Sequence, residues 1–270
     1  MRIFTVLRGL VLTFLLGGPA VAGDSALRDL SNGDDSRPFR AVGRLEVGGN
    51  NFCTATLIEE RVVLTAAHCV VRTDGTTAMP GDIRFLAGFR DGRADAYRTG
   101  RRLVVAKGYR PDMNDAGTLA HDVALIELDR PVDTVQVAPI PMAQNGTGAA
   151  VGVVSYAHDR ADRPSLQEEC SVLGRDRGAL IMSCEADYGT SGAPVLSFAH
   201  GGVRIVSVVS AMANAGAQKV SIGTDLAATL PTLRAELSGS DGVFFRAAPQ
   251  VRRLTPDTAR AHGPGKFLRP

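Results

Sequence analysis

The sequence predicts an all-β fold. Thirty Gly and fourteen Pro in 270 residues indicate many turns, which favours short strands over a helical bundle. From Val42 onward, apolar runs of mostly five to eight residues, many with β-branched side chains, alternate with Gly, Asp and Asn. This spacing is typical of sandwiches and barrels. With 44% hydrophobic residues, the chain is able to bury a sizeable core.

The first 22 residues have the pattern of a secretory signal peptide. Arg2 and Arg8 supply positive charge, Leu10–Leu16 is apolar, and Ala20-Val21-Ala22 is a small-x-small cleavage site. We therefore expect a mature chain that starts near Gly23 and is secreted or periplasmic. The alternative is a membrane anchor, but the apolar run is too short to cross ~30 Å of hydrocarbon. We expect no stable membrane association.

Composition divides the rest of the chain into three parts. Residues 23–40 form a leader whose polar, turn-rich text predicts a loose segment. Residues 41–237 carry the apolar runs and form the predicted folded domain. Residues 238–270 are rich in Arg, Pro, Gly and Ala, a composition that predicts a flexible tail.

The best helix candidate lies at the end of the predicted domain, at residues 224–237. Either Thr224 or Asp225 is suited to cap its N-terminus. Pro231 falls inside this stretch, where it either splits the helix or marks a restart.

Charge and cysteine content exclude several classes of function. The net charge of +2 gives no reason to expect a nucleic-acid partner. Four cysteines in an exported chain indicate two disulfides. Because no CxxC motif or ligand-spaced His/Cys cluster is present, we expect no metal and no cofactor. Calcium binding has no specific motif behind it.

Three sequence islands point to nucleophilic catalysis. They are LTAAHC at 64–69, HDVALI at 121–126 and GTSGAPV at 189–195. A serine nucleophile needs a nearby base, and a histidine is suited to this role at neutral pH. A carboxylate orients the imidazole, and glycines around the serine let two N–H groups face a developing oxyanion.

Together these islands resemble the chymotrypsin/trypsin-like serine peptidase family. TAAHC resembles the family's signature around its base histidine, HDVALIEL its aspartate strand, and GTSGAPV the nucleophile loop, closest to bacterial members. The resemblance covers roughly residues 41–235 and implies two six-stranded antiparallel β-barrels with the site between them. It implies a serine endopeptidase acting on protein or peptide substrates. We expect it to be a monomer.

The resemblance also implies the role of each site residue. Ser191 is expected as nucleophile, His68 as general base and Asp122 as the orienting carboxylate. The N–H groups of Gly189 and Ser191 are expected to form the oxyanion hole. The spacing of sixteen matches a family disulfide between Cys53 and Cys69, which leaves Cys170 to pair with Cys184.

Two departures from animal trypsins agree with each other. Thr190 stands where those enzymes carry an aspartate before the nucleophile, and the sequence has no Ile-Val-Gly-Gly segment. We therefore expect no activation by a new N-terminal amine bound to that aspartate. An obligatory cut after Arg40 would contradict this expectation.

Primary specificity is open. Glu185 stands six residues before Ser191, where trypsins hold their specificity aspartate. It is either the base of the substrate pocket or a surface residue at a strand end. Ser210 and Met212 are expected to bind substrate, on a strand edge that pairs with its backbone. Glutamate-specific relatives carry a His on this strand, and its absence disfavours glutamyl specificity.

Other interpretations of the same residues remain. His121 and Asp115 are neighbours that compete for the triad roles, and we interpret both as surface residues. A catalytically inactive binding module is the main alternative function. A quality-control protease would need a further domain, and an esterase on the same fold would share the acyl-enzyme chemistry.

Overall fold

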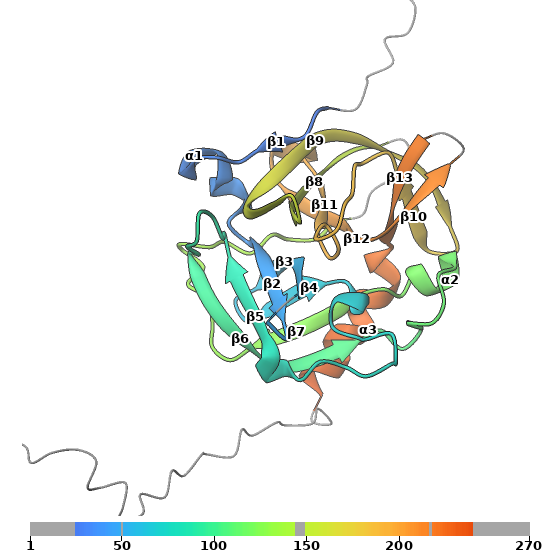
Figure 1. Cartoon of the computed structure of the whole chain (residues 1–270), viewed down its shortest axis with the longest axis horizontal. Helices are drawn as coiled ribbons and strands as arrows, with labels where there is room; N and C mark the ends of the chain where they lie inside the picture. Colours follow the sequence, from blue (N-terminus) through green and yellow to red (C-terminus); the bar gives the residue numbers. More distant parts are fainter. Residues whose placement is uncertain (1–24, 50, 144–148, 216–217, 240–270) are drawn as a thin grey trace, which may run out of the picture.

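The computed structural model describes residues 25–49, 51–143, 149–215 and 218–239. The predicted signal peptide and nearly all of the predicted tail lie outside these residues. Figure 1 shows two β-barrels in contact, the first built from the N-terminal half and the second from the C-terminal half. The predicted all-β fold with two six-stranded barrels and a C-terminal helix is therefore confirmed.

The first barrel is closed and antiparallel, with strand order β2-β3-β4-β7-β6-β5. Its strands are β2 (Val42–Val47), β3 (Asn51–Glu59), β4 (Val62–Thr65), β5 (Ile83–Ala87), β6 (Ala96–Val105) and β7 (Ala124–Leu128). Pairing of β2 with β5 closes the barrel. Valine, leucine and isoleucine side chains fill its interior, which is the physical reason for the β-branched runs in the sequence.

The second barrel closes in the order β8-β9-β10-β13-β12-β11, because β11 and β9 both pair with β8. Its strands are β8 (Ala150–Ala157), β9 (Arg160–Asp176), β10 (Ala179–Met182), β11 (Pro194–Ser197), β12 (Arg204–Ala215) and β13 (Gln218–Thr224). A shift of register at Val209/Ala211 bends β12 beside the first barrel. Bulges of this kind change the direction in which nearby side chains point.

Within the described residues, the N-terminal segment packs on the second barrel, in contrast to the loose leader that we expected. Strand β1 (Arg28–Asp29) adds to the edge of β9. Helix α1 (Gly33–Ser36) and a 3₁₀ turn (Arg37–Phe39) follow. The reason is burial: Leu30 has no exposed surface and belongs to the main core. Sequence reasoning missed it because two leucines, Leu27 and Leu30, in a short polar stretch are too few to give a periodic pattern.

Helix α3 (Leu226–Ser238) returns from the second barrel and packs against β6 and β7 of the first. Its apolar face consists of four buried leucines spaced at helical intervals, Leu226, Leu230, Leu233 and Leu237. Asp225, one of the two predicted caps, accepts a hydrogen bond from the Ala227 N–H at 3.1 Å.

The helix continues unbroken through Pro231. A proline inside a helix removes one N–H donor. The buried leucines on the face toward the first barrel offset this loss, since most helical stability in proteins comes from such packing.

The remaining short elements are helix α2 (Ala116–Leu119) and 3₁₀ turns at Ala67–Cys69, Pro80–Asp82 and Ala199–Gly201. In the chain, helix α2 lies between β6 and β7 of the first barrel. In space, it contacts β10 and β13 of the second barrel. Among the described helices, none is both long enough and apolar enough to cross a membrane.

Candidate active site

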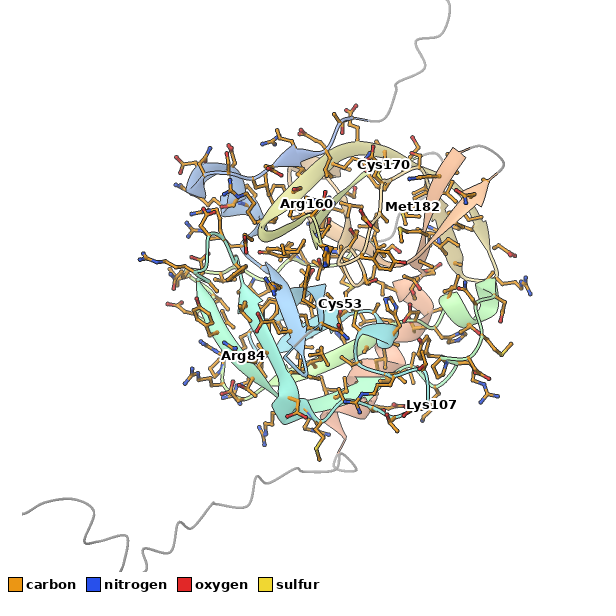
Figure 2. All side chains as sticks on the ribbon, in the orientation of Figure 1. Cys53, Arg84, Lys107, Arg160, Cys170 and Met182 are labelled. Carbon is orange, nitrogen blue, oxygen red and sulfur yellow. A yellow bond between two sulfur atoms is a disulfide. The ribbon has the colours of Figure 1, made fainter. Side chains whose placement is uncertain are left out.

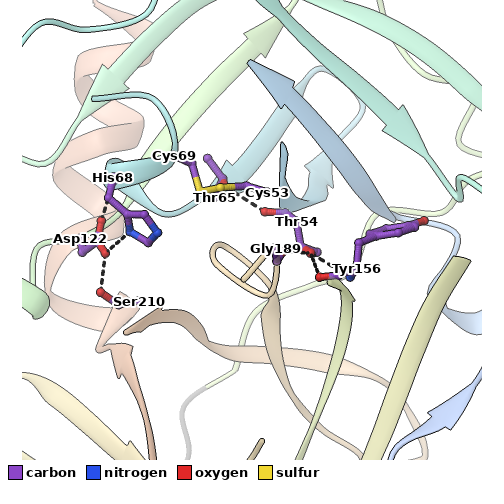
Figure 3. The surroundings of a disulfide bond; sticks show 9 residues. All are labelled: Cys53, Thr54, Thr65, His68, Cys69, Asp122, Tyr156, Gly189 and Ser210. Atoms are coloured by element: carbon purple, nitrogen blue, oxygen red, sulfur yellow. Dashed lines mark hydrogen bonds and ion pairs between the residues drawn. A yellow bond between two sulfur atoms is a disulfide. The ribbon is translucent and has the colours of Figure 1, made fainter. Parts of the chain in front are cut away.

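The imidazole of His68 is joined to the carboxylate of Asp122 (Figure 3). His68 lies on the 3₁₀ turn after β4, and Asp122 lies between α2 and β7. Asp122 Oδ2 is 2.6 Å from His68 Nδ1, and Oδ1 accepts the His68 backbone N–H at 2.8 Å. Because an ionised carboxylate only accepts hydrogen bonds, Nδ1 carries a proton, which leaves the lone pair on Nε2. Nε2 is thus suited to accept a proton from a nucleophile.

Asp122 is 1% exposed, and its carboxylate has a third partner. Ser210 Oγ on β12 donates a very short hydrogen bond to Oδ2. The buried side chain of Ser210 faces Asp122, so its predicted contact with substrate is left to its backbone on the strand edge and stays a prediction. The register shift on β12 next to Ser210 accounts for this direction. A buried carboxylate with three donors is held in one orientation.

The Thr224 side chain contacts the backbone of the segment that carries Asp122. Its buried hydroxyl donates to the Leu119 carbonyl at 2.9 Å and lies 3.3 Å from the Asp122 carbonyl. It links the end of β13 to the loop that precedes β7. Of the two predicted helix caps, Thr224 therefore has this role and Asp225 caps α3.

The loop that carries Ser191 is held by its carbonyl groups. The Tyr188 carbonyl accepts from His158 N at 2.7 Å, and the Thr190 carbonyl accepts from Ala193 N at 2.9 Å. The Gly189 and Ser191 carbonyls accept from Thr54, through Oγ1 at 2.8 Å and N at 2.9 Å respectively. Four successive carbonyls are thus fixed.

Two N–H groups of this loop remain free to bind a ligand. Within the described part of the chain, neither Gly189 N nor Ser191 N has an acceptor. These are the two groups that the sequence predicted for an oxyanion hole. Their neighbours Thr190 N and Gly192 N are occupied by the carbonyls of Asp187 and Val209, at 2.9 and 2.8 Å.

Two glycines in this loop are required by their surroundings. Gly189 has φ of +97°, and a Cβ there would come within 2.7 Å of the Phe52 ring. Gly192 has φ of +78°, and a Cβ there would collide with the Thr65 hydroxyl and the Thr54 carbonyl. Both positions favour glycine on conformation and on space.

The close packing of Gly192 on β3 and β4 brings the neighbouring Ser191 against the segment that carries His68. A Cβ at Gly192 would lie 3.1 Å from Ala66 N, two residues before His68. Among the described residues, no hydrogen bond joins Ser191 Oγ to His68. Such bonds are often long in free enzymes and tighten when substrate binds.

Thr190 is fully buried, and its hydroxyl accepts the Asp187 N–H at 3.2 Å. This position has no carboxylate to receive an N-terminal amine. The geometry is consistent with our expectation that activation does not use that switch, which remains a prediction.

Both predicted disulfides are present. Cys53 on β3 is bonded to Cys69, the last residue of the turn that carries His68. Cys170 on β9 is bonded to Cys184, two residues after β10. Figure 2 shows Cys53 and Cys170 in different barrels. Each bond closes a loop of about fifteen residues, for which chain entropy predicts a stabilisation of about 3 kcal/mol.

A cavity of about 840 Å³ lies beside the Ser191 loop. Glu185 and Met212, two of the predicted substrate-binding residues, both line it and are both exposed. Its wall is formed by Leu27, Asp159, Arg160, Ser183, Cys184, Glu185, Ala186, Asp187, Met212, Ala213, Asn214, Lys219 and Val220. Glu185 and Asp187 have no ion-pair partner among the described residues, whereas Arg160 is paired with Asp159 at 2.9 Å.

Gln167 connects this cavity to the N-terminal segment, and sequence reasoning missed it. It is 1% exposed. Its Oε1 accepts the Glu185 N–H at 2.7 Å, and its Nε2 donates to the Ser25 carbonyl at 3.2 Å. Leu27, two residues after Ser25, lines the cavity. A lone glutamine in a polar stretch carries no local signal of such a contact.

The two competitors for triad roles have other partners. His121 Nδ1 lies 2.8 Å from the Gly117 carbonyl. Asp115 caps α2 and accepts the Gly117 N–H at 2.8 Å. The Thr118 hydroxyl beside Asp115 lowers the pKa of that carboxyl. Close to Asp122, burial and then the charge of that carboxylate raise the pKa of Tyr109 to about 12.

His68 and the sulfurs of Cys53 and Cys69 lie close enough together to suggest a metal site. The two sulfurs are bonded to each other, so they offer no thiolate ligand. This cluster of three residues is therefore explained by the disulfide beneath the histidine.

Comparison with known proteins agrees with this geometry. The Trypsin family model matches residues 31–229. Serine protease 23 from Bos taurus is 30% identical over 179 residues, which cover 58% of this chain and 46% of that protein. Neutrophil elastase from Mus musculus is 29% identical over 172 residues, 60% of each chain. The chain thus spans less than half of the length of serine protease 23.

Solved structures share the fold at lower identity. A structure of Glu endopeptidase in complex with MPD superposes with a TM-score of 0.66 and 22% identity, covering 80% of this chain and 99% of the other. An inactivated protease paralogue from the scabies mite has a TM-score of 0.61 and 16% identity, covering 80% and 97%. The fold is therefore similar both to a protein named as an endopeptidase and to one described as inactivated. The family match and the barrel architecture together show that this chain belongs to the trypsin-like serine peptidase family.

Proposed function

We propose that this protein is a secreted or periplasmic serine endopeptidase with Ser191 as nucleophile, His68 as general base and Asp122 as the orienting carboxylate. The observation that carries the proposal is the pairing of a fixed His68–Asp122 unit with two free N–H groups on the Ser191 loop. Its two disulfides are consistent with an oxidising compartment.

In the first half-reaction, Ser191 Oγ attacks the peptide carbonyl while His68 Nε2 takes its proton. The buried Asp122 stabilises the imidazolium that forms, and the N–H groups of Gly189 and Ser191 bind the oxyanion. His68 then gives the proton to the leaving amine, and an acyl-enzyme remains on Ser191. Water, activated by the same imidazole, releases the acid product and restores the serine.

Strand β12 offers an edge for the substrate backbone. From Ala211 to Ala215 it pairs only with β13 among the described strands. An extended peptide is able to add to this edge as a further strand. Met212 then lies between the backbone edge and the cavity, which fits its predicted role in substrate binding.

For the residue before the cleaved bond, we propose a preference for Arg or Lys. The support is the charge of the cavity wall. Glu185 and Asp187 have no ion-pair partner among the described residues. Of the two cations that line the cavity, Arg160 is paired with Asp159, which leaves Lys219 against two carboxylates. A cationic side chain would satisfy the unpaired carboxylates.

The test is hydrolysis of a mixed peptide library by the oxidised protein, with sequencing of the products. Ser191→Ala is expected to abolish cleavage and labelling by a serine-directed phosphonate. Glu185→Gln is expected to keep the labelling and lower kcat/KM for basic residues roughly tenfold or more. A wild-type protein that neither cleaves nor is labelled would favour the alternative function, an inactive binding module on the same fold.

A further inference from the structure

Thr54 on β3 belongs to the first barrel, yet it contacts the Ser191 loop of the second barrel at two points. Its backbone N–H donates to the Ser191 carbonyl at 2.9 Å, and its hydroxyl lies 2.8 Å from the Gly189 carbonyl. Thr54 has no exposed surface. Figure 3 shows its side chain directed at Gly189 and Tyr156.

The direction of the Thr54 hydroxyl proton follows from its partners. Tyr156 N on β8 donates to Thr54 Oγ1 at 3.0 Å, which occupies the hydroxyl as an acceptor. Its one proton is then donated to the nearer of two carbonyls, Gly189 at 2.8 Å rather than Tyr156 at 3.4 Å. The hydroxyl thus links β8 to the Gly189 carbonyl through a single, directed bond.

That carbonyl belongs to the peptide unit between the two free N–H groups. Its other end, Thr190 N, is held by the Asp187 carbonyl at 2.9 Å. With both ends held, this peptide fixes the position of its two neighbours, which carry the free N–H groups of Gly189 and Ser191 and are themselves held at the Tyr188 and Thr190 carbonyls. The carbonyls of Tyr188, Thr190 and Ser191 accept from backbone N–H groups, whereas the Gly189 carbonyl accepts from a side chain, the Thr54 hydroxyl.

We propose that Thr54 is a positioning residue for catalysis, whose hydroxyl keeps the oxyanion-binding N–H groups in place by holding the Gly189 carbonyl. The proposal rests on the proposed function. Removal of the hydroxyl lets the 189–190 peptide rotate, which weakens binding of the oxyanion more than binding of the ground-state substrate.

Thr54→Val tests the proposal, because valine has nearly the same shape without the hydroxyl. Thr56→Val is the matched control: Thr56 lies on the same strand, is 1% exposed, and its hydroxyl has no hydrogen-bond partner among the described residues. Thr54→Ser and Thr54→Ala form a second pair that differs only in the hydroxyl. It keeps the test valid if the valine variant does not fold.

We expect Thr54→Val to lower kcat roughly 10- to 100-fold with KM within about twofold, less than the loss of a whole oxyanion donor. Affinity for a peptide aldehyde, which forms a tetrahedral adduct, should fall in parallel, while affinity for a cleaved product peptide stays unchanged. Thr54→Ser should retain activity within about threefold, and Thr56→Val should match wild type.

A Thr54→Val protein with wild-type kcat would overturn the proposal. Equal losses in Thr54→Val and Thr56→Val, or in Thr54→Ser and Thr54→Ala, would do so as well, since they would show a packing effect. Failure of the proposed function has a different signature: the wild-type protein itself would show no cleavage and no phosphonate labelling.

Discussion

The His68–Asp122 pair and the neighbouring cavity both lie against residues of β12, but the carboxylate of the pair is buried and the carboxylates of the cavity are exposed. Asp122 is buried and receives three hydrogen bonds, one of them from Ser210 on β12. Glu185, in the cavity that Met212 of β12 also lines, is exposed and has no ion-pair partner among the described residues. A group held in one geometry is buried with partners, while under the proposed function the exposed Glu185 is left open to meet a substrate charge.

The largest expected effect comes from the buried group. Asp122→Asn removes the charge that stabilises the imidazolium, and its amide N–H₂ is able to donate a hydrogen bond to His68 Nδ1. The imidazole then favours the tautomer with Nε2 protonated, which cannot accept the Ser191 proton. We expect kcat to fall about 10⁴-fold, as in the serine-protease template, measured by steady-state hydrolysis of a peptide found in the library.

Asp112→Asn is the control for this measurement, because Asp112 is exposed on the same connecting segment between β6 and β7. It should leave kcat unchanged. An Asp122→Asn enzyme within tenfold of wild type would mean that the buried carboxylate does not orient the base.

The cavity should respond in KM rather than in kcat. Gln167→Met keeps the side-chain volume but removes both amide contacts, so that Glu185 N and the Ser25 carbonyl lose their partner. Both contacts are partly buried, so the loss of each costs up to roughly 1–3 kcal/mol, and Tm should fall by a few degrees. Because Glu185 N loses its anchor, KM should rise roughly tenfold with kcat nearly constant, measured by steady-state kinetics and thermal unfolding.

Gln136→Met, at an exposed glutamine, should change neither quantity. A drop in kcat without a change in KM would contradict the separation drawn between the two regions. It would place Gln167 with the catalytic centre.

The smallest expected effect is at Asp115, which caps α2 in front of Asp122. Its pKa is lowered in the folded protein by its hydrogen bond to the Thr118 side chain. A lowered folded-state pKa contributes stability above the unfolded value of about 3.9, and this stability is lost as pH falls through the lower folded-state pKa. Tm of wild type should therefore exceed that of Asp115→Ala at pH 7, and the difference should shrink below about pH 4. A difference independent of pH would assign the effect to helix propensity alone.

Local motifs in the sequence predicted His68, Asp122 and the Cys53–Cys69 disulfide, and the Cys170–Cys184 disulfide followed because these two cysteines were left. His68, Asp122 and Cys69 each lie within a short run of strand and turn residues, and such a run can be recognised from the sequence alone. The same is true of α3, whose leucine spacing and capping residue are visible without a structure.

Other features could not be predicted from local patterns. Strand β1 forms because Leu30 reaches the core, and the cavity beside the Ser191 loop gains Leu27 as a consequence. The contact of the Ser210 hydroxyl with Asp122, beside the register shift on β12, was not predicted either. In each case the partner lies more than eighty residues away, and no short window of sequence contains both groups.

The sequence by itself determined the kind of chemistry this protein is equipped for, because a nucleophile, a base and a carboxylate each need flanking residues that are contiguous in the chain. Only the tertiary structure decided how these groups are held. The hydroxyls of Thr54 and Ser210 acquire their contacts where the two barrels pack together, and the amide of Gln167 acquires its contacts where the N-terminal segment packs on the second barrel. The physical reason is that a hydrogen bond acts over about 3 Å, and the packing of the barrels sets which distant residues come that close.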